Sequence, residues 1–135
     1  MTYKSKRLAH ARHNEAVSNK LHDAGGFGDW VITTAFYAAL HFVKAKLFPL
    51  QYVHPQDGAQ VYPTFESFYG TGLILKGKHD TLYCLVKKQC PQIAPEYRQL
   101  LDTCLTSRYF DYEQCPEMVK RSRKSFKVIK AYCHR

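Results

Sequence analysis

Apolar residues recur at intervals of three and four along most of the chain, which is the spacing that places side chains on one face of an α-helix. No segment shows a convincing alternation of apolar and polar residues, the pattern of a strand. We therefore expect an all-α fold, an up-and-down helical bundle of four main helices plus one short helix, in a single domain of residues 1–135. The predicted helices cover residues 3–23, 30–48, 78–90, 95–107 and 116–135.

Helix-stopping residues separate these segments. Gly25 and Gly26 supply a stop and a turn, Asp29 can cap the second helix, and Pro49 ends it. Residues 49–77 form a long connection that is rich in proline, glycine and aromatic residues. A connection of this length in a small domain is usually functional or partly disordered.

The spacing also predicts which faces of the first and last helices are buried. In the first helix, the inward positions are His10, His13, Val17, Leu21 and Ala24. In the last helix, they are Val119, Ser122, Phe126, Ile129 and Cys133.

The second helix is apolar almost all round, which is typical of a helix in the centre of a bundle. Within it, steps of three and four place Thr34, Tyr37, His41 and Lys44 on one line. An unpaired buried polar group costs about 1–3 kcal/mol, so these side chains must find partners. We expect the segment from Trp30 to Leu47 to be central.

The same segment carries a family resemblance. Its pattern WxxTxxFYAALHxVxAxL resembles the central helix of HEPN-type domains, which are small helical bundles of prokaryotic toxin, defence and nucleotide-binding proteins. Lys78-His79 at the start of the third helix and the segment Ser107–Tyr112 also resemble motifs of that superfamily. The resemblance covers most of the chain outside residues 49–77. It implies a homodimer with the Ser107–Tyr112 turn near the two-fold axis.

One departure from the family bears on catalysis. Ribonucleases of this superfamily have an Arg followed four to six residues later by a His, and no His follows Arg98 or Arg108 at that distance. Asp111 stands where relatives often have a second Arg. The usual ribonuclease centre is therefore altered or lost, and whether the chain is an enzyme stays open.

Other residues could supply acid–base chemistry. The candidate catalytic residues are Tyr37, His41, His79, Arg108 and Asp111. A His can act as a general acid or base, and an Arg can hold a phosphate. The alternative for each is structural: His41 in the core, His79 at a helix start, and Arg108 paired with Asp111.

The net charge of +9 indicates an anionic partner. The excess of positive charge is most marked in the last helix, because no acidic residue follows Glu117. Its candidate RNA-binding residues are Lys120, Arg121, Arg123, Lys124 and Lys127. A solvated basic face is the alternative, and basic residues near a helix C-terminus are also favoured by the helix dipole.

The cysteine content and the hydropathy of the chain indicate the cellular compartment in which we expect the protein. The five cysteines are odd in number and form no CxxC pair, so we expect a reducing, cytoplasmic setting, no metal site and no cofactor. The N-terminal residues contain no apolar run of the kind found in secretory signals. Residues 30–47 are too short and too polar for a membrane span.

Two functional hypotheses follow. The first is an HEPN-like domain directed at RNA or a nucleotide, in a defence or toxin–antitoxin setting, with an altered or lost ribonuclease site. The second is a non-catalytic module for protein–protein interaction or dimerisation, with itself or with a partner subunit. A DNA-binding role ranks lowest, because no helix-turn-helix pattern is evident.

Overall fold

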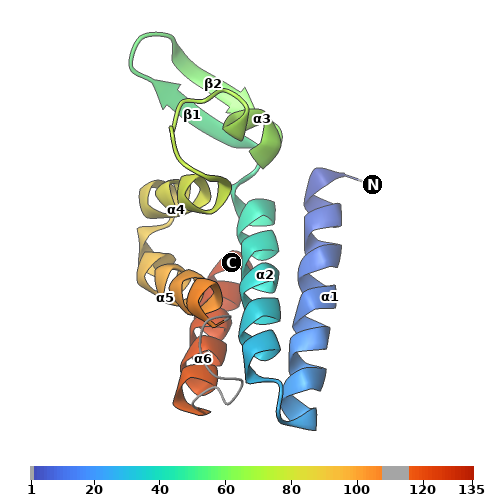
Figure 1. The fold of residues 1–135 in the computed structure, drawn as a ribbon. Helices are drawn as coiled ribbons and strands as arrows, with labels where there is room; N and C mark the ends of the chain where they lie inside the picture. Colours follow the sequence, from blue (N-terminus) through green and yellow to red (C-terminus); the bar gives the residue numbers. More distant parts are fainter. Residues whose placement is uncertain (1, 108–115) are drawn as a thin grey trace.

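The computed structural model describes residues 2–107 and 116–135, and these residues are mainly helical, as the sequence predicts (Figure 1). The predicted helices correspond to α1, α2, α4, α5 and α6, with ends that differ by at most two residues. In chain order the elements are α1 (Tyr3–Ala24), α2 (Gly28–Leu47), β1 (Leu50–His54), β2 (Gly58–Tyr62), α3 (Phe65–Tyr69), α4 (Lys78–Gln89), the 3-10 turn η1 (Pro91–Ile93), α5 (Ala94–Thr106) and α6 (Pro116–Cys133).

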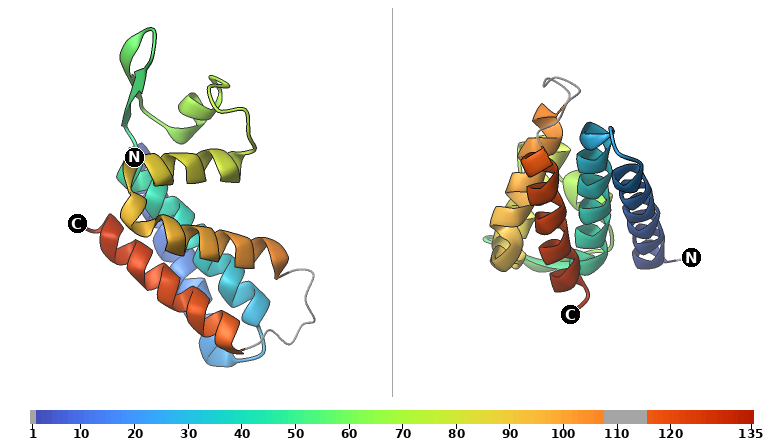
Figure 2. Two further views of the ribbon diagram at one scale, coloured as in Figure 1. Left: turned by 90° about the vertical axis from the view of Figure 1, so that its left-hand side faces the viewer. Right: turned by 90° about the horizontal axis from the view of Figure 1, so that it is seen from below.

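The helix α2 is central, as predicted. It lies between α1 on one side and α5 and α6 on the other, and α4 lies across its C-terminal end (Figures 1 and 2). Because α2 meets helices on several sides, its apolar residues are buried almost all round. The exception is Trp30 in its first turn, whose side chain is 55% exposed.

The start of α2 differs from the prediction. The helix begins at Gly28, so Asp29 lies in the first turn rather than at the cap. A carboxylate in the first turn still interacts favourably with the helix dipole. The preceding turn contains Gly25 and Gly26, whose φ angles of 77° and 81° are favourable only for glycine.

The predicted inward face of α1 is correct only in part, because Val17 and Leu21 are half-buried and His10 stacks on His41 of α2, whereas His13 and Ala24 are exposed. His10 is nonetheless exposed, and the buried positions are Ala11 and Ser18. The hydroxyl of Ser18 donates a hydrogen bond of 2.9 Å to the carbonyl of Val31 in α2. Small side chains at the contact allow α1 and α2 to approach closely, whereas the periodicity of larger residues pointed to a neighbouring face.

The predicted inward face of the last helix is correct. In α6, Ser122, Phe126 and Ile129 are buried, while Val119 and Cys133 are half-buried. In α5, the buried side chains are Tyr97, Leu100, Leu101 and Cys104. These residues join α2 and α4 in one hydrophobic core.

The expectation of no strands is wrong for residues 50–62. The strands β1 and β2 form an antiparallel hairpin, in which Leu50 pairs with Tyr62 and His54 pairs with Gly58. Leu50, Tyr52 and His54 alternate toward the protein, and Phe68 of α3 packs against this side of the hairpin. The hairpin is visible beyond the end of α2, next to α4 (Figures 1 and 2).

Candidate functional site

A large groove lies between the α1–α2 turn and α6, with a volume of about 1090 Å³. We call it the basic groove. Its apolar lining comes from Leu21, Phe27, Val31 and Val119. Its charged lining comes from α6 and consists of Lys120, Arg123, Lys124 and Lys127.

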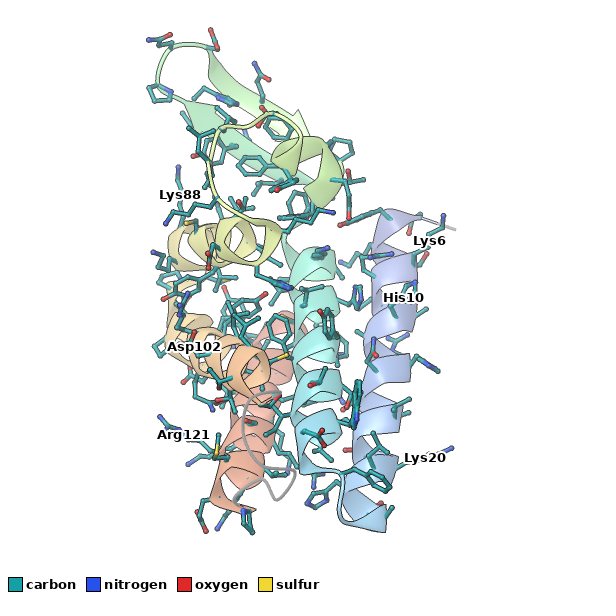
Figure 3. All side chains as sticks on the ribbon, viewed as in Figure 1. Lys6, His10, Lys20, Lys88, Asp102 and Arg121 are labelled. Carbon is teal, nitrogen blue, oxygen red and sulfur yellow. The ribbon has the colours of Figure 1, made fainter. Side chains whose placement is uncertain are left out.

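The position of these cations follows from the amphipathic pattern of α6. The buried stripe of Ser122, Phe126 and Ile129 fixes how the helix rotates against the core. Steps of three and four then place the four cations on one adjacent face. Arg121 is on another face and projects away from α2 (Figure 3). The structure thus brings together four of the five predicted RNA-binding residues and separates Arg121 from them.

Arg123 is tied to the first helix. Its guanidinium lies next to Nδ1 of His22, and its Nη2 donates to Oδ1 of Asn19 at 3.3 Å. Arginine can only donate hydrogen bonds, so Nδ1 of His22 accepts in this arrangement. The three lysines of the groove are exposed at its edge.

The charged side chains that line the basic groove are all positive among the described residues. None of the described residues that line it is acidic. Two acidic residues, Glu15 and Asp23, line an adjoining cavity of about 340 Å³. Glu15 already accepts from Lys130 of α6 at 2.7 Å. The three lysines are exposed and form no salt bridge with another residue in the described part of the chain.

The lining also supplies aromatic surface. Phe27, which lines the groove from the turn before α2, is 46% exposed. Cations at the edge suit phosphate groups, and an exposed ring beside them can stack on an unpaired base. The aromatic side of the groove could not be predicted from the sequence, because Phe27 becomes a neighbour of α6 only through tertiary packing.

A second pocket, of about 220 Å³, lies between α2, α3 and α4. We call it the histidine pocket. Its polar lining consists of Tyr37, His41 and Lys44 from α2 and of Lys78 and His79 from α4. Three of the five predicted catalytic residues therefore share one pocket, whereas Arg108 and Asp111 lie outside the described residues.

His41 is held by α1. Nη1 of Arg7 lies 3.4 Å from Nδ1 of His41, and the ring of His10 stacks on it with 5.1 Å between ring centres (Figure 3 labels His10). Burial, together with the charges of Arg7, Lys44 and His10, lowers the pKa of His41 to about 4. Near pH 7 its imidazole is neutral, with Nδ1 accepting from Arg7 and the proton on Nε2.

His79 lies on the opposite wall of the pocket. Its ring meets Phe36 and Tyr37 edge-on, at 5.4 Å and 6.2 Å between ring centres. Burial lowers its pKa, and the charge of Lys44 acts in the same direction. Its Nδ1 is buried and has no hydrogen-bond partner in the described part of the chain.

The cations of the histidine pocket are only partly neutralised. Nζ of Lys44 lies 3.7 Å from a carboxylate oxygen of Glu66 and 4.6 Å from the centre of the Phe65 ring. Burial is the main cause that lowers the pKa of Lys44. Nζ of Lys78 lies 5.8 Å from the ring centre of Tyr69.

The pocket combines two neutral imidazoles, a phenol and two ammonium groups, a set that can bind an anion and exchange a proton with it. Sequence reasoning missed Arg7, because its contact with His41 spans 34 positions and arises from the packing of α1 on α2. No spacing within one helix could have indicated it.

Among residues 2–107 and 116–135, no three His, Cys, Asp or Glu side chains form a group that could hold a metal ion. Within the same residues, no helix combines the length and the apolar character that crossing a membrane requires. Comparison with known proteins found no matching family model, no similar curated protein and no similar solved structure.

Proposed function

We propose that this chain is a helical RNA-binding domain that contacts the RNA backbone through the basic groove. The observation that carries the proposal is the convergence of four cations from α6 on a groove whose described lining contains no acid. Each lysine or arginine that neutralises a phosphate releases counterions, which favours binding in a salt-dependent way. The exposed ring of Phe27 favours a single-stranded ligand, whose unpaired bases can stack on it.

The test is a charge reversal at Lys120, Arg123, Lys124 and Lys127, each changed to Glu. Binding of a single-stranded RNA, followed by fluorescence anisotropy, should be lost at moderate salt. Because single strands contribute a slope of about −0.7 per phosphate contact, the plot of log K against log salt should flatten accordingly. Circular dichroism should show an unchanged helical signal, since these positions lie off the buried stripe.

The matched control makes the same change in net charge elsewhere. Lys4, Lys6, Arg12 and Lys20 are exposed cations of α1 that do not line the basic groove, and each is changed to Glu. This variant should keep most of the affinity of the parent protein. Equal losses in the two variants would mean that total charge, rather than the groove, attracts RNA, and would overturn the proposal.

We further propose that the domain is HEPN-like, acts in the cytoplasm in a defence or toxin–antitoxin setting, and has an altered or lost ribonuclease site. The support is the buried central helix with its Tyr37–His41 line, the order of the helices around it, and Lys78-His79 at the start of α4. An up-and-down bundle and a homodimer with residues 107–112 near its axis belong to the same proposal.

One observation favours the second candidate function, an interaction or dimerisation module. Val53 and Val61 lie on the outer face of the hairpin and are 64% and 65% exposed. Leu75, in the segment before α4, is 92% exposed. Exposed apolar residues that gather at one end of a small domain are typical of contact surfaces between proteins.

A further inference from the structure

The structure points to a second ligand site, separate from the basic groove. We propose that the histidine pocket binds the phosphate group of a phosphate monoester, with Lys44 and Lys78 neutralising it and with His41 and His79 donating hydrogen bonds to it. This role is independent of the proposed RNA contact in the groove.

The charge balance of the pocket supports an anion. Lys44 and Lys78 line it directly, and one nearby carboxylate, that of Glu66, lies 3.7 Å from Lys44. Asp80 is close in sequence to the pocket, but its carboxylate lies 3.6 Å from the guanidinium of Arg98. The remaining positive charge is suited to a phosphate monoester, which carries between −1.5 and −2 charges near pH 7.

The hydrogen-bond donors of the pocket are arranged for an oxyanion. Nδ1 of His41 faces the guanidinium of Arg7, so the ring proton is on Nε2, and His41 is one of the residues that line the pocket. Nδ1 of His79 is buried without a partner within the described residues. A buried polar atom of this kind normally has a partner, and a phosphate oxygen would supply one to its N–H tautomer once the side chains that cover Nδ1 in the unliganded protein move aside.

The groups that surround His41 set how binding responds to pH. Arg7 and His10 face it from α1, Lys44 lies on its own helix, and Glu66 of α3 opposes them. A bound dianion favours the protonated imidazole, so binding should raise the pKa of both His41 and His79. Proton uptake on binding is therefore an expected signature of the site.

The size of the pocket limits the ligand. Its 220 Å³ is smaller than the roughly 300–1,000 Å³ of pockets that enclose a drug-sized molecule. The pocket therefore accommodates a phosphate and part of a sugar, with the remainder outside. Phe65 and Leu82 supply the apolar wall that a sugar or base edge would contact.

The experiment follows the imidazole resonances of His41 and His79 by ¹H–¹⁵N NMR. The probes are inorganic phosphate, a nucleoside 5′-monophosphate, the unphosphorylated nucleoside and dimethyl phosphate, all at constant ionic strength. We expect saturable shifts with the first two probes only, because dimethyl phosphate carries a single charge. Changing Lys44 or Lys78 to Met should weaken phosphate binding at least about tenfold, which corresponds to one charge-assisted hydrogen bond.

Matched controls change neighbouring lysines that do not line the pocket, namely Lys46→Met and Lys76→Met. Both should bind phosphate as the parent does. The absence of saturable shifts at millimolar phosphate, or equal losses in the control variants, would overturn the proposal. Equal binding of dimethyl phosphate would also overturn it, since the site would then not select a monoester.

Two further measurements complete the experiment. The first distinguishes a phosphate at the end of an RNA from that of a free nucleotide, and the second distinguishes the histidine pocket from the basic groove. A 5′-phosphorylated RNA that shifts His41 and His79 more strongly than its 5′-hydroxyl counterpart identifies an RNA end, whereas stronger binding of the free nucleotide identifies a small molecule. The variant with four reversed charges in the basic groove should still bind phosphate in the pocket. Loss of RNA binding in that variant with retained phosphate binding distinguishes the two proposals.

Discussion

At position 41, an imidazole lies against Arg7 and His10 of α1, and its environment disfavours a second proton. Burial and the neighbouring charges lower the pKa of His41 to about 4, from an ordinary value of 6.5. The sequence identified His41 as a candidate but indicated neither its protonation state nor its partner. Both depend on residues of another helix.

The stability of the protein should respond to this shift. Above pH 6.5, His41 is neutral in both the folded and unfolded states. Between pH 6.5 and about 4 the unfolded chain binds a proton that the folded chain does not, so stability falls as the pH falls. Urea denaturation followed by circular dichroism should show this slope in the parent protein and a shallower slope in His41→Gln.

The control for this prediction is His13→Gln, which removes an exposed histidine from the same bundle. It should keep the slope of the parent. His79, whose pKa is also lowered, contributes in the same direction, so some slope remains in His41→Gln. Identical slopes for His41→Gln and the parent would show that His41 is not the group responsible.

At the scale of elements, the buried face of a helix could be predicted only where apolar and polar residues occupy clearly separate faces. In α6, large apolar residues and cations occupy separate faces, so its buried side was readable from spacing. In α1, the buried contact is made by Ala11 and Ser18, which carry little hydrophobic signal. The buried face of a helix that packs through small side chains therefore cannot be predicted from the spacing of large apolar residues.

The hairpin was missed for a different reason. Its inward positions are Leu50, Tyr52 and His54, and a histidine at the third position obscures the apolar alternation. The turn contains Asp57-Gly58, a dipeptide that favours hairpins, with a φ of 76° at Gly58. That turn signal, weighed with the aromatic residues on both sides of it, would have indicated the two strands.

The contact between α1 and α2 yields a prediction at this scale. Ala11 is fully buried against α2, so Ala11→Leu should force the helices apart and destabilise the protein by about 1–3 kcal/mol. Ala16→Leu, at an exposed position of the same helix, should leave stability nearly unchanged. Thermal unfolding of the two variants provides the comparison. A stable Ala11→Leu protein would contradict the close packing of these helices.

At the scale of the molecule, each site combines residues that are distant in the sequence. The charged wall of the basic groove was predictable because it belongs to a single helix. Its apolar wall and the Arg7–His41 contact were not predictable, because they depend on how helices pack. The candidate sites were therefore recognised by their residue types rather than by their completed geometry.

Self-association separates the two candidate functions at this scale. If the outer face of the hairpin forms a dimer interface, Val53→Lys with Val61→Lys should convert a dimer into a monomer in light scattering. If the dimer forms around residues 107–112, the same variant should remain dimeric. RNA binding should be unchanged in either case. A parent protein that is monomeric at tens of micromolar would contradict both modes of pairing.

The attachment of Arg123 to Asn19 and His22 has a consequence for recognition. In the folded protein these contacts already restrict the rotamers of the Arg123 side chain. The exposed lysines around it, in contrast, would lose conformational entropy on binding a ligand. If the basic groove binds RNA as proposed, Arg123 would be a fixed point at which one phosphate is positioned. The flexible lysines on either side can then adapt to strands of different sequence and curvature.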